Sequence, residues 1–183
     1  MASKLLPFRD YDEHEVINLF KYSGTIPVDQ GTVVSINNGW NQSQETELLG
    51  AVGKTYSNTV SDRYGVSASV TAAGTGDANP LGILLHSVKE EDENGEKLIY
   101  NPRKVAEMEV VLSGQAVPIV SRGVFLYSGS TIDGETVTAG QKLYSDANGL
   151  LTTGYGGTDQ VAVAQALGGV DSTYNSILIK LEL

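Results

Sequence analysis

A strict alternation of apolar and polar residues is the feature that most constrains the fold of this chain. In the final stretch, NSILIKLEL, the polar side carries Lys180 and Glu182, and the apolar side carries Ile177, Ile179, Leu181 and Leu183. Because successive side chains of a β-strand point to opposite faces, this stretch predicts a half-buried strand. The same alternation in EMEVVLSG predicts a strand over 107–114, with an apolar side of Met108, Val110 and Leu112. VAVAQALGG, residues 161–169, predicts a third strand, whose face of small side chains consists of Ala162, Ala164 and Ala166.

Turn sequences separate the predicted strands. The stretch GQKLYSDANGLLTTG, residues 140–154, has the pattern of a strand, a tight Asp-Ala-Asn-Gly turn and a returning strand. The chain has 21 glycines, and its short runs rich in Val, Ile, Thr and Tyr are bounded by Gly, Asn, Asp and Ser, which is typical of a mainly β protein. We therefore expect a mainly β fold, a β-sandwich or barrel of antiparallel strands with an extended N-terminal arm and at most one or two short helices.

The chain divides into two parts of different character. Residues 1–25 predict an N-terminal arm with a short helix, because Asp12 and Glu15 are spaced as a capping box ahead of an apolar run. Residues 26–183 predict a β-rich domain. Within this domain, the charged stretch KEEDENGEKLIYNP, residues 89–102, predicts an exposed hairpin tip around its Asn-Gly pair.

The β-rich domain has the pattern of two pseudo-repeated halves, 26–113 and 114–183. Each half contains a strand after a Gly-bearing turn (IPVDQGTVVSI, then ETVTAGQKLYS), an apolar Gly-bearing strand (LGILLHSV, then VAVAQALGGV) and an alternating strand (EMEVVLSG, then NSILIKLEL). The order is the same in both halves, although the first half carries insertions. Duplication and the chance reuse of short β sequences both explain the pattern, and the sequence leaves these alternatives open.

Charge and cysteine content exclude several classes of partner. Twenty-two acidic residues against twelve basic ones give a formal net charge of −10, and the cations are scattered along the chain. Since sequence-independent nucleic-acid binding depends on phosphate neutralisation, we expect no nucleic-acid partner and no anionic membrane. The chain has no cysteine, which suits synthesis in a reducing bacterial cytoplasm. The first residues lack the apolar core of a secretion signal, and no apolar run is long enough to predict a membrane span.

The motifs that carry chemistry are incomplete. GAVGKTYS lacks the first glycine of a phosphate-binding loop, because position 48 is Leu, and GTGDAN has Asn79 where a dinucleotide fingerprint requires a third glycine. DENGEK resembles a calcium loop, yet Lys97 occupies the position of the sharp-turn glycine. His14 and His86 are the two histidines and stand in unrelated contexts, whereas metal sites and catalytic triads need several converging groups. We therefore predict no enzyme, no catalytic residue, no metal and no cofactor. A carboxylate pair for glycoside cleavage stays open, because its spacing is a three-dimensional property.

Apolar and aromatic residues without an evident local core are the candidates for a capsid or subunit interface. In the arm these are Leu5, Leu6, Phe8 and Tyr11, and in the polar loop INNGWNQSQ the candidate is Trp40. Exposed aromatic residues are enriched at protein interfaces, and a terminus that orders on binding lengthens a contact with a neighbour. The alternatives are that the arm covers one end of the chain's own barrel and that Trp40 packs against the nearest sheet.

The succession of strand sequences resembles the head decoration, or cement, proteins of tailed bacteriophages. The resemblance covers residues 26–36 and 81–183, and it rests on IPVDQGTVVSI, NPLGILLHSV, VVLSGQAVPIV, ETVTAGQKLYSDANGLLT, DQVAVAQALGG and ILIKLEL. Its strongest part is the hairpin of the form G-x-x-L/V-Y, turn, Gly, x-L/V-T at 140–154. The segment 37–79 and the acidic arm have no counterpart in this pattern.

The resemblance implies a structural virion protein that binds the outer surface of a bacteriophage capsid, often as a homotrimer at local three-fold positions. Its partner is then the major capsid protein, and it stabilises the expanded head by bridging capsomers. We expect it on the capsid exterior after synthesis in the host bacterial cytoplasm. The alternative within virions is a head-fibre or tail-associated carbohydrate-binding adhesin, with Trp40 and the tyrosines as sugar contacts. Outside virions, the alternative is a small carbohydrate-binding module.

Overall fold

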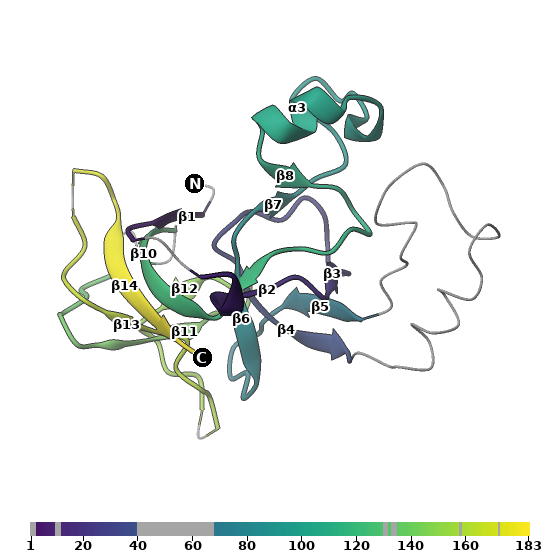
Figure 1. Ribbon diagram of the computed structural model, residues 1–183. Coiled ribbons are helices and arrows are strands. Elements are labelled where there is room, and N and C mark those ends of the chain that lie inside the picture. The colour runs from purple at the N-terminus through teal and green to yellow at the C-terminus, as the bar shows by residue number, and fades with distance from the viewer. Residues whose placement is uncertain are drawn as a thin grey trace.

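In the part of the chain that the structure describes, the fold consists of two six-stranded β-sheets and one two-stranded sheet (Figure 1). The structure is a computed structural model and describes residues 3–9, 12–39, 68–129, 132, 135–157, 159–171 and 173–183. Within these ranges the single α-helix is α3 (Pro102–Glu107). The mainly β class with antiparallel sheets, predicted from the sequence, is confirmed.

One six-stranded sheet, here called the β14 sheet, contains the C-terminal strand. Its order is β1-β10-β14-β13-β11-β12, and all neighbouring pairs are antiparallel. The strands are β1 (Lys4–Pro7), β10 (Arg122–Ser128), β14 (Ile177–Glu182), β13 (Ala164–Ala166), β11 (Lys142–Ser145) and β12 (Leu151–Thr152). Figure 1 shows the sheet curled, with both marked chain ends beside it. The alternation predicted for the terminal strand is confirmed, because β14 buries Ile177, Ile179 and Leu181.

The other six-stranded sheet, here called the β4 sheet, has the order β2-β9-β6-β4-β5-β3. Its strands are β2 (Val16–Ile17), β9 (Ile119–Val120), β6 (Pro80–Leu84), β4 (Val33–Asn38), β5 (Ser69–Ala72) and β3 (Lys21–Tyr22). All of its pairs are antiparallel except β3 with β5. The small sheet pairs β7 (Ser87–Val88) with β8 (Val110–Val111) in parallel.

Two apolar cores lie on opposite faces of the β4 sheet. The main core joins one face of this sheet to the inner face of the β14 sheet, and its members include Val33, Ile83, Val120, Phe125, Tyr127 and Ile179. The neighbouring residue on each strand of the β4 sheet turns to the second core, which includes Val34, Leu84, Ile119, Phe20, Tyr22 and Val117. This alternation buries β9, β6 and the start of β4 on both sides, whereas Ile36 in the second half of β4 is 50% exposed. The β14 sheet has one core-facing side, and its outer face carries half-buried and exposed side chains.

The hairpin predicted over 140–154 is present as β11, a tight turn and β12. The carboxylate of Asp146 accepts hydrogen bonds from the N–H groups of Asn148 at 2.8 Å and Leu150 at 2.7 Å. Gly149 has a φ of +76°, a left-handed conformation that glycine adopts without a steric penalty. The Asp-Ala-Asn-Gly sequence therefore forms the turn that its composition predicts.

The strand predicted over 107–114 is wrong in its first half. Asn101 caps α3, since its side chain accepts a hydrogen bond from the N–H of Lys104 at 3.4 Å, and Pro102 occupies the first turn. The helix continues to Glu107, and Glu109 has a φ of 51°, which interrupts any extended backbone. Only β8 remains as a strand in this segment.

The short helix expected near 12–20 is reduced to a 3₁₀ turn, η1 (Glu13–Glu15). The capping-box hydrogen bond from the N–H of Asp12 to the carboxylate of Glu15 is present, at 3.0 Å. The chain then enters β2, which pairs with β9. Pairing with a distant strand thus overrides the local helical preference.

The two large sheets repeat one strand order. In the β4 sheet β9, β6, β4 and β5 are neighbours, and in the β14 sheet β14, β13, β11 and β12 are neighbours. Gly31 and Gly140 each lie two residues before the matching strands β4 and β11, with φ values of +86° and +87°. Their N–H groups donate to the carbonyls of Leu84 and Ala166, both at 2.8 Å. In this correspondence β9 matches β14, in place of the strand predicted over 107–114, and β9 lies beyond the predicted boundary at residue 113. The correspondence favours duplication, and the halves 26–113 and 114–183 remain a proposal.

Candidate functional site

The five residues predicted for an interface fall into three different environments. Leu5 is 1% exposed and belongs to the main core. Leu6 and Phe8 are 54% and 55% exposed. Tyr11 and Trp40 lie outside the described residues. Leu5 therefore holds the arm to the chain's own fold, while Leu6 and Phe8 leave apolar surface exposed.

The described part of the arm is an edge strand of the β14 sheet. Strand β1 pairs antiparallel with residues 125–128 of β10. On either side of β1, the hydroxyl of Ser3 donates to the carbonyl of Gln30 at 2.8 Å, and the N–H of Phe8 donates to the carbonyl of Val124 at 3.1 Å. Since side chains alternate along a strand, burial of Leu5 directs Leu6 to the outer face of the sheet.

Leucines form a row across the outer face of the β14 sheet. Leu6 of β1 is opposite Leu126 of β10, and Leu126 is opposite Leu178 of β14. Leu167, which follows β13, donates its N–H to the carbonyl of Leu178 at 2.8 Å and is 42% exposed. Directly opposed side chains on one face lie about 5 Å apart, so this row, here called the leucine strip, is a continuous apolar surface.

A parallel row beside the leucine strip is mainly polar. Its members lie opposite one another across β11, β13, β14 and β10, and they are Lys142, Gln165, Lys180 and Val124. Phe8 joins the end of this row, because its N–H is bonded to Val124. An apolar strip thus runs next to lysine side chains on the same surface.

The charge balance of this outer face is the reverse of that of the chain. The chain has 12 Lys and Arg against 22 Asp and Glu. Among the outward-facing strand residues of the β14 sheet the single carboxylate is that of Glu182, and the cations are Lys4, Arg122, Lys142 and Lys180. The Nζ of Lys180 lies 2.9 Å from a carboxylate oxygen of Glu182, and this hydrogen bond lowers the pKa of the Glu182 carboxyl. The strand residues of the outer face are therefore mainly apolar and cationic on an acidic protein, and the carboxylate of Glu135 reaches this face at β12, where it accepts a hydrogen bond from the Thr152 hydroxyl at 2.7 Å.

Acidic groups return at one end of this face. An open hollow of about 510 Å³ is lined there by Asp12, His14, Glu15, Ser121, Arg122, Glu182 and Leu183. Arg122 shares this hollow with the carboxylates of Asp12 and Glu15. Because Lys180 is paired with Glu182, the cationic excess of the face rests on Lys4 and Lys142.

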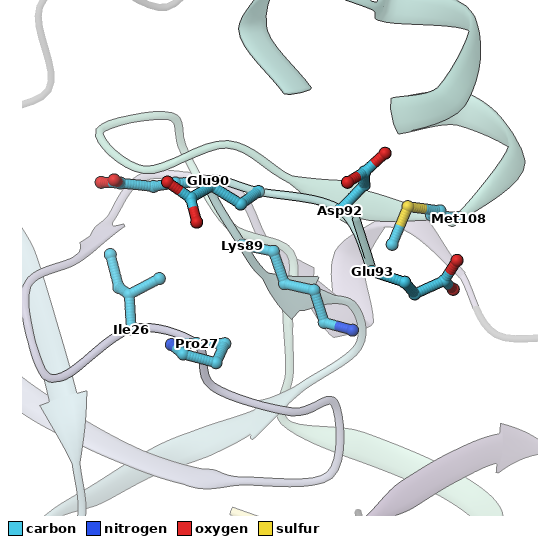
Figure 2. Close-up of a pocket in the computed structure, with 8 residues that line it drawn as sticks. Ile26, Pro27, Lys89, Glu90, Asp92, Glu93 and Met108 are labelled. Carbon is cyan, nitrogen blue, oxygen red and sulfur yellow. The ribbon is translucent and has the colours of Figure 1, made fainter. Parts of the chain in front are cut away.

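Another hollow lies beside the acidic hairpin tip. It measures about 580 Å³ and is lined by Ile26, Pro27, Lys89, Glu90, Glu91, Asp92, Glu93 and Met108. Figure 2 shows the carboxylates of Glu90, Asp92 and Glu93 pointing in different directions. Asp92 is paired with Lys104, whose hydrogen bond lowers the pKa of the Asp92 carboxyl, and it also accepts from two backbone N–H groups of the turn. Its carboxylate therefore stabilises the turn.

The histidines do not assemble a site with other ligating groups. His14 is exposed, and Nδ1 of His86 is buried without a hydrogen-bond partner. Across the described ranges, no group of three or more His, Asp or Glu side chains is arranged to hold a metal ion. The outer face of the β14 sheet, with its row of leucines, is therefore the candidate functional surface of the described residues.

The fold is mainly β, and the outer face of its β14 sheet carries a row of apolar side chains. A family model described as structural cement protein (E217 gp24/Pam3 gp6) matches residues 20–182. The chain belongs to this phage cement protein family. No curated protein matches the chain. No helix in the part of the chain that the structure describes has the length and apolarity of a membrane span.

Family membership confirms the resemblance inferred from the strand sequences. The family is structural and non-enzymatic in kind, and it supports a capsid-stabilising role, association with phage capsid proteins and a place in the virion. The match includes the segment 37–79, for which the strand pattern offered no counterpart, and it begins after Leu6 and Phe8.

Three residues of the leucine strip were not predicted from the sequence as part of an interface. Leu126 and Leu178 stand on the polar side of their strands, and Leu167 follows a strand end. The available signal was a leucine that breaks the apolar-in, polar-out alternation within RGVFLYS and NSILIKLEL. Such outward leucines mark a surface that needs a partner when they gather.

Proposed function

We propose that this protein binds the outer surface of a phage capsid, contacts the major capsid protein and stabilises the expanded head by bridging neighbouring capsomers. The observation that carries the proposal is the cement-family match over residues 20–182. The proposal includes assembly as a homotrimer at local three-fold positions. It also includes synthesis in the host cytoplasm before addition to the capsid exterior.

Stabilisation follows from thermodynamic linkage. A protein that binds the expanded shell but not its precursor lowers the free energy of the expanded state by its differential binding free energy. The effect of one copy is modest, since a ligand at 100 times its Kd contributes about 2.7 kcal/mol. Many copies that bridge adjacent capsomers add these contributions over the whole shell, and together they oppose the pressure of packaged DNA.

The fold suits a rigid bridging element. The strands β9 and β6 and the start of β4 are buried on both faces, and the hydrogen bonds of β1 hold the described arm to the β14 sheet. A preformed sheet surface loses little conformational entropy when it binds. A rigid body that joins two capsomers transmits force between them, whereas a flexible linker would extend.

The proposal is tested by titrating the purified protein onto expanded, undecorated capsids and onto unexpanded precursor capsids. We expect saturable, stoichiometric binding to the expanded form and much weaker binding to the precursor. Equal affinity for both forms would contradict the linkage mechanism, because a ligand without differential affinity shifts no equilibrium.

The adhesin alternative depends mainly on Trp40, which lies outside the described residues. The cement-family match favours the capsid role. Tyr100 and Tyr174, 85% and 77% exposed, are single residues in separate segments, and Tyr155, 56% exposed, packs edge-to-face on Tyr144 with ring centroids 5.1 Å apart. The capsid role is therefore better supported than the adhesin role.

A further inference from the structure

We infer that the outer face of the β14 sheet is the surface that contacts the shell, and that the contacted surface is acidic and exposes apolar side chains of its own. This inference rests on the proposed function and specifies the side of the molecule and the chemistry of its partner. The face comprises the leucine strip, Phe8 and three lysines, Lys4, Lys142 and Lys180.

Several apolar side chains of this face are exposed to solvent. Leu6, Phe8 and Leu167 are 54%, 55% and 42% exposed, and they adjoin half-buried Leu126 and Leu178 across hydrogen-bonded strands. Scattered exposed leucines are normal on a protein surface, whereas a contiguous apolar patch with a polar rim marks an interaction site. The row of Lys142, Gln165 and Lys180 beside the leucine strip provides such a rim.

The charges of the face indicate the chemistry of its partner. The chain as a whole carries a net charge of −10, yet the outward-facing strand residues here include four cations against one carboxylate. Lys180 is paired with that carboxylate, and Arg122 lies beside Asp12 and Glu15. Lys4 and Lys142 therefore carry the cationic character, with Glu135 the carboxylate that reaches the face at β12. Complementary potentials across an interface fix orientation and suppress wrong partners. A cationic rim around an apolar strip therefore fits an acidic surface with apolar groups.

The same charges disfavour a second copy of this chain as the occupant. A symmetric dimer through this face would be isologous, so the cations of one copy would approach a surface that carries the same cations. Like charges in juxtaposition destabilise an interface. The acidic remainder of the molecule would in turn repel an acidic shell, so this face is the one that best approaches it.

The test uses four single variants of the full chain, arranged as two matched pairs. Leu6→Asp and Lys142→Glu alter the proposed face. Ile99→Asp and Arg103→Glu make the same changes in charge on η2 (Leu98–Tyr100) and α3, which Figure 1 shows at the top of the molecule, away from the β14 sheet. Ile99 is 50% exposed, close to the 54% of Leu6. Melting temperatures of the free variants establish that each one folds.

Binding is measured by cosedimentation with expanded, undecorated capsids, and the free proteins are run on size-exclusion chromatography. We expect at least tenfold weaker binding for Leu6→Asp and Lys142→Glu and less than twofold change for the two controls. Binding of both face variants at wild-type strength would overturn the inference while leaving the proposed function intact. Equal weakening in all four variants would also overturn it, because the face would then have no special role.

Two further outcomes separate the inference from its alternatives. The free protein with Leu6→Asp could dissociate from an oligomer to a monomer that still binds capsids. In that case the face joins copies of this chain, and the inference is wrong. If the wild-type protein does not bind expanded capsids at all, the proposed function and the inference fail together.

Discussion

Val33 donates a hydrogen bond of 2.7 Å from its backbone N–H to the carbonyl of Gly149, and this bond joins the two large sheets. Val33 opens β4, and Gly149 lies in the turn between β11 and β12. A Cβ atom on Gly149 would lie 2.8 Å from both the Val33 carbonyl oxygen and the Thr32 methyl carbon. The turn of the hairpin therefore packs directly on the neighbouring sheet.

Replacing Gly149 with alanine should destabilise the fold through strain and through overpacking. The φ of +76° is unfavourable for alanine by about 1–2 kcal/mol, and the crowded Cβ adds about 1–3 kcal/mol. Urea unfolding of the purified variant measures the loss. Gly140→Ala is the matched control, because Gly140 has a φ of +87° and no atom within 4 Å of the added Cβ. Equal losses in the two variants would show that the turn does not pack against β4.

Leu5 and Leu6 provide a test of how the arm belongs to the fold. Leu5→Ala should lower the free energy of unfolding by about 2–5 kcal/mol, since Leu5 is 1% exposed in the main core. Leu6→Ala should change it little, because Leu6 is 54% exposed. Thermal unfolding of both variants gives the comparison. A melting temperature that is unaffected by Leu5→Ala would mean that β1 is detached in solution and is free to dock elsewhere.

Tyr127 should make stability sensitive to alkaline pH. Its ring is buried, and its hydroxyl accepts a hydrogen bond from the N–H of Leu151 at 3.1 Å. Burial raises the pKa of Tyr127 from 10.0 to about 12. Between these values the unfolded chain loses the proton while the folded protein keeps it, so stability is fully present below pH 10 and declines as the pH rises toward 12.

Comparison of wild type with Tyr127→Phe isolates this effect. The wild-type protein should lose about 1.4 kcal/mol more per pH unit between pH 10 and 12 than the variant loses. Burial also raises the pKa of Tyr22, and its contribution cancels because Tyr22 is present in both proteins. Urea unfolding at pH 8, 10 and 11 provides the data. Parallel stability curves for the two proteins would show that Tyr127 ionises normally in the folded state.

Local sequence patterns predicted an element correctly where the element depends on residues that are close together in the chain. The Asp146 turn and the strand β14 follow from neighbouring residues, because turn chemistry and the period-two alternation act within a few positions. The strand prediction for 107–114 was wrong in its first half because Asn101 and Pro102 start a helix ahead of this segment. That helix start signal lies outside the alternating run.

The candidate surface depends on strand register, which the sequence does not carry locally. Leu6, Leu126 and Leu178 are far apart in the chain and meet only because β1 and β14 both pair with β10 in one register. A shift by one residue would turn each of these leucines to the core. The interface prediction therefore named Leu6 and Phe8 from the arm, and it could not include their partners.

Electron cryomicroscopy of expanded capsids saturated with the purified protein tests the central claim most directly. We expect a regular lattice of density on the outer surface of the head. The outer face of the β14 sheet should lie against the shell, and each copy should touch more than one capsomer. Density confined to five-fold vertices or the tail, or the absence of bound protein from the particles, would contradict the cement function.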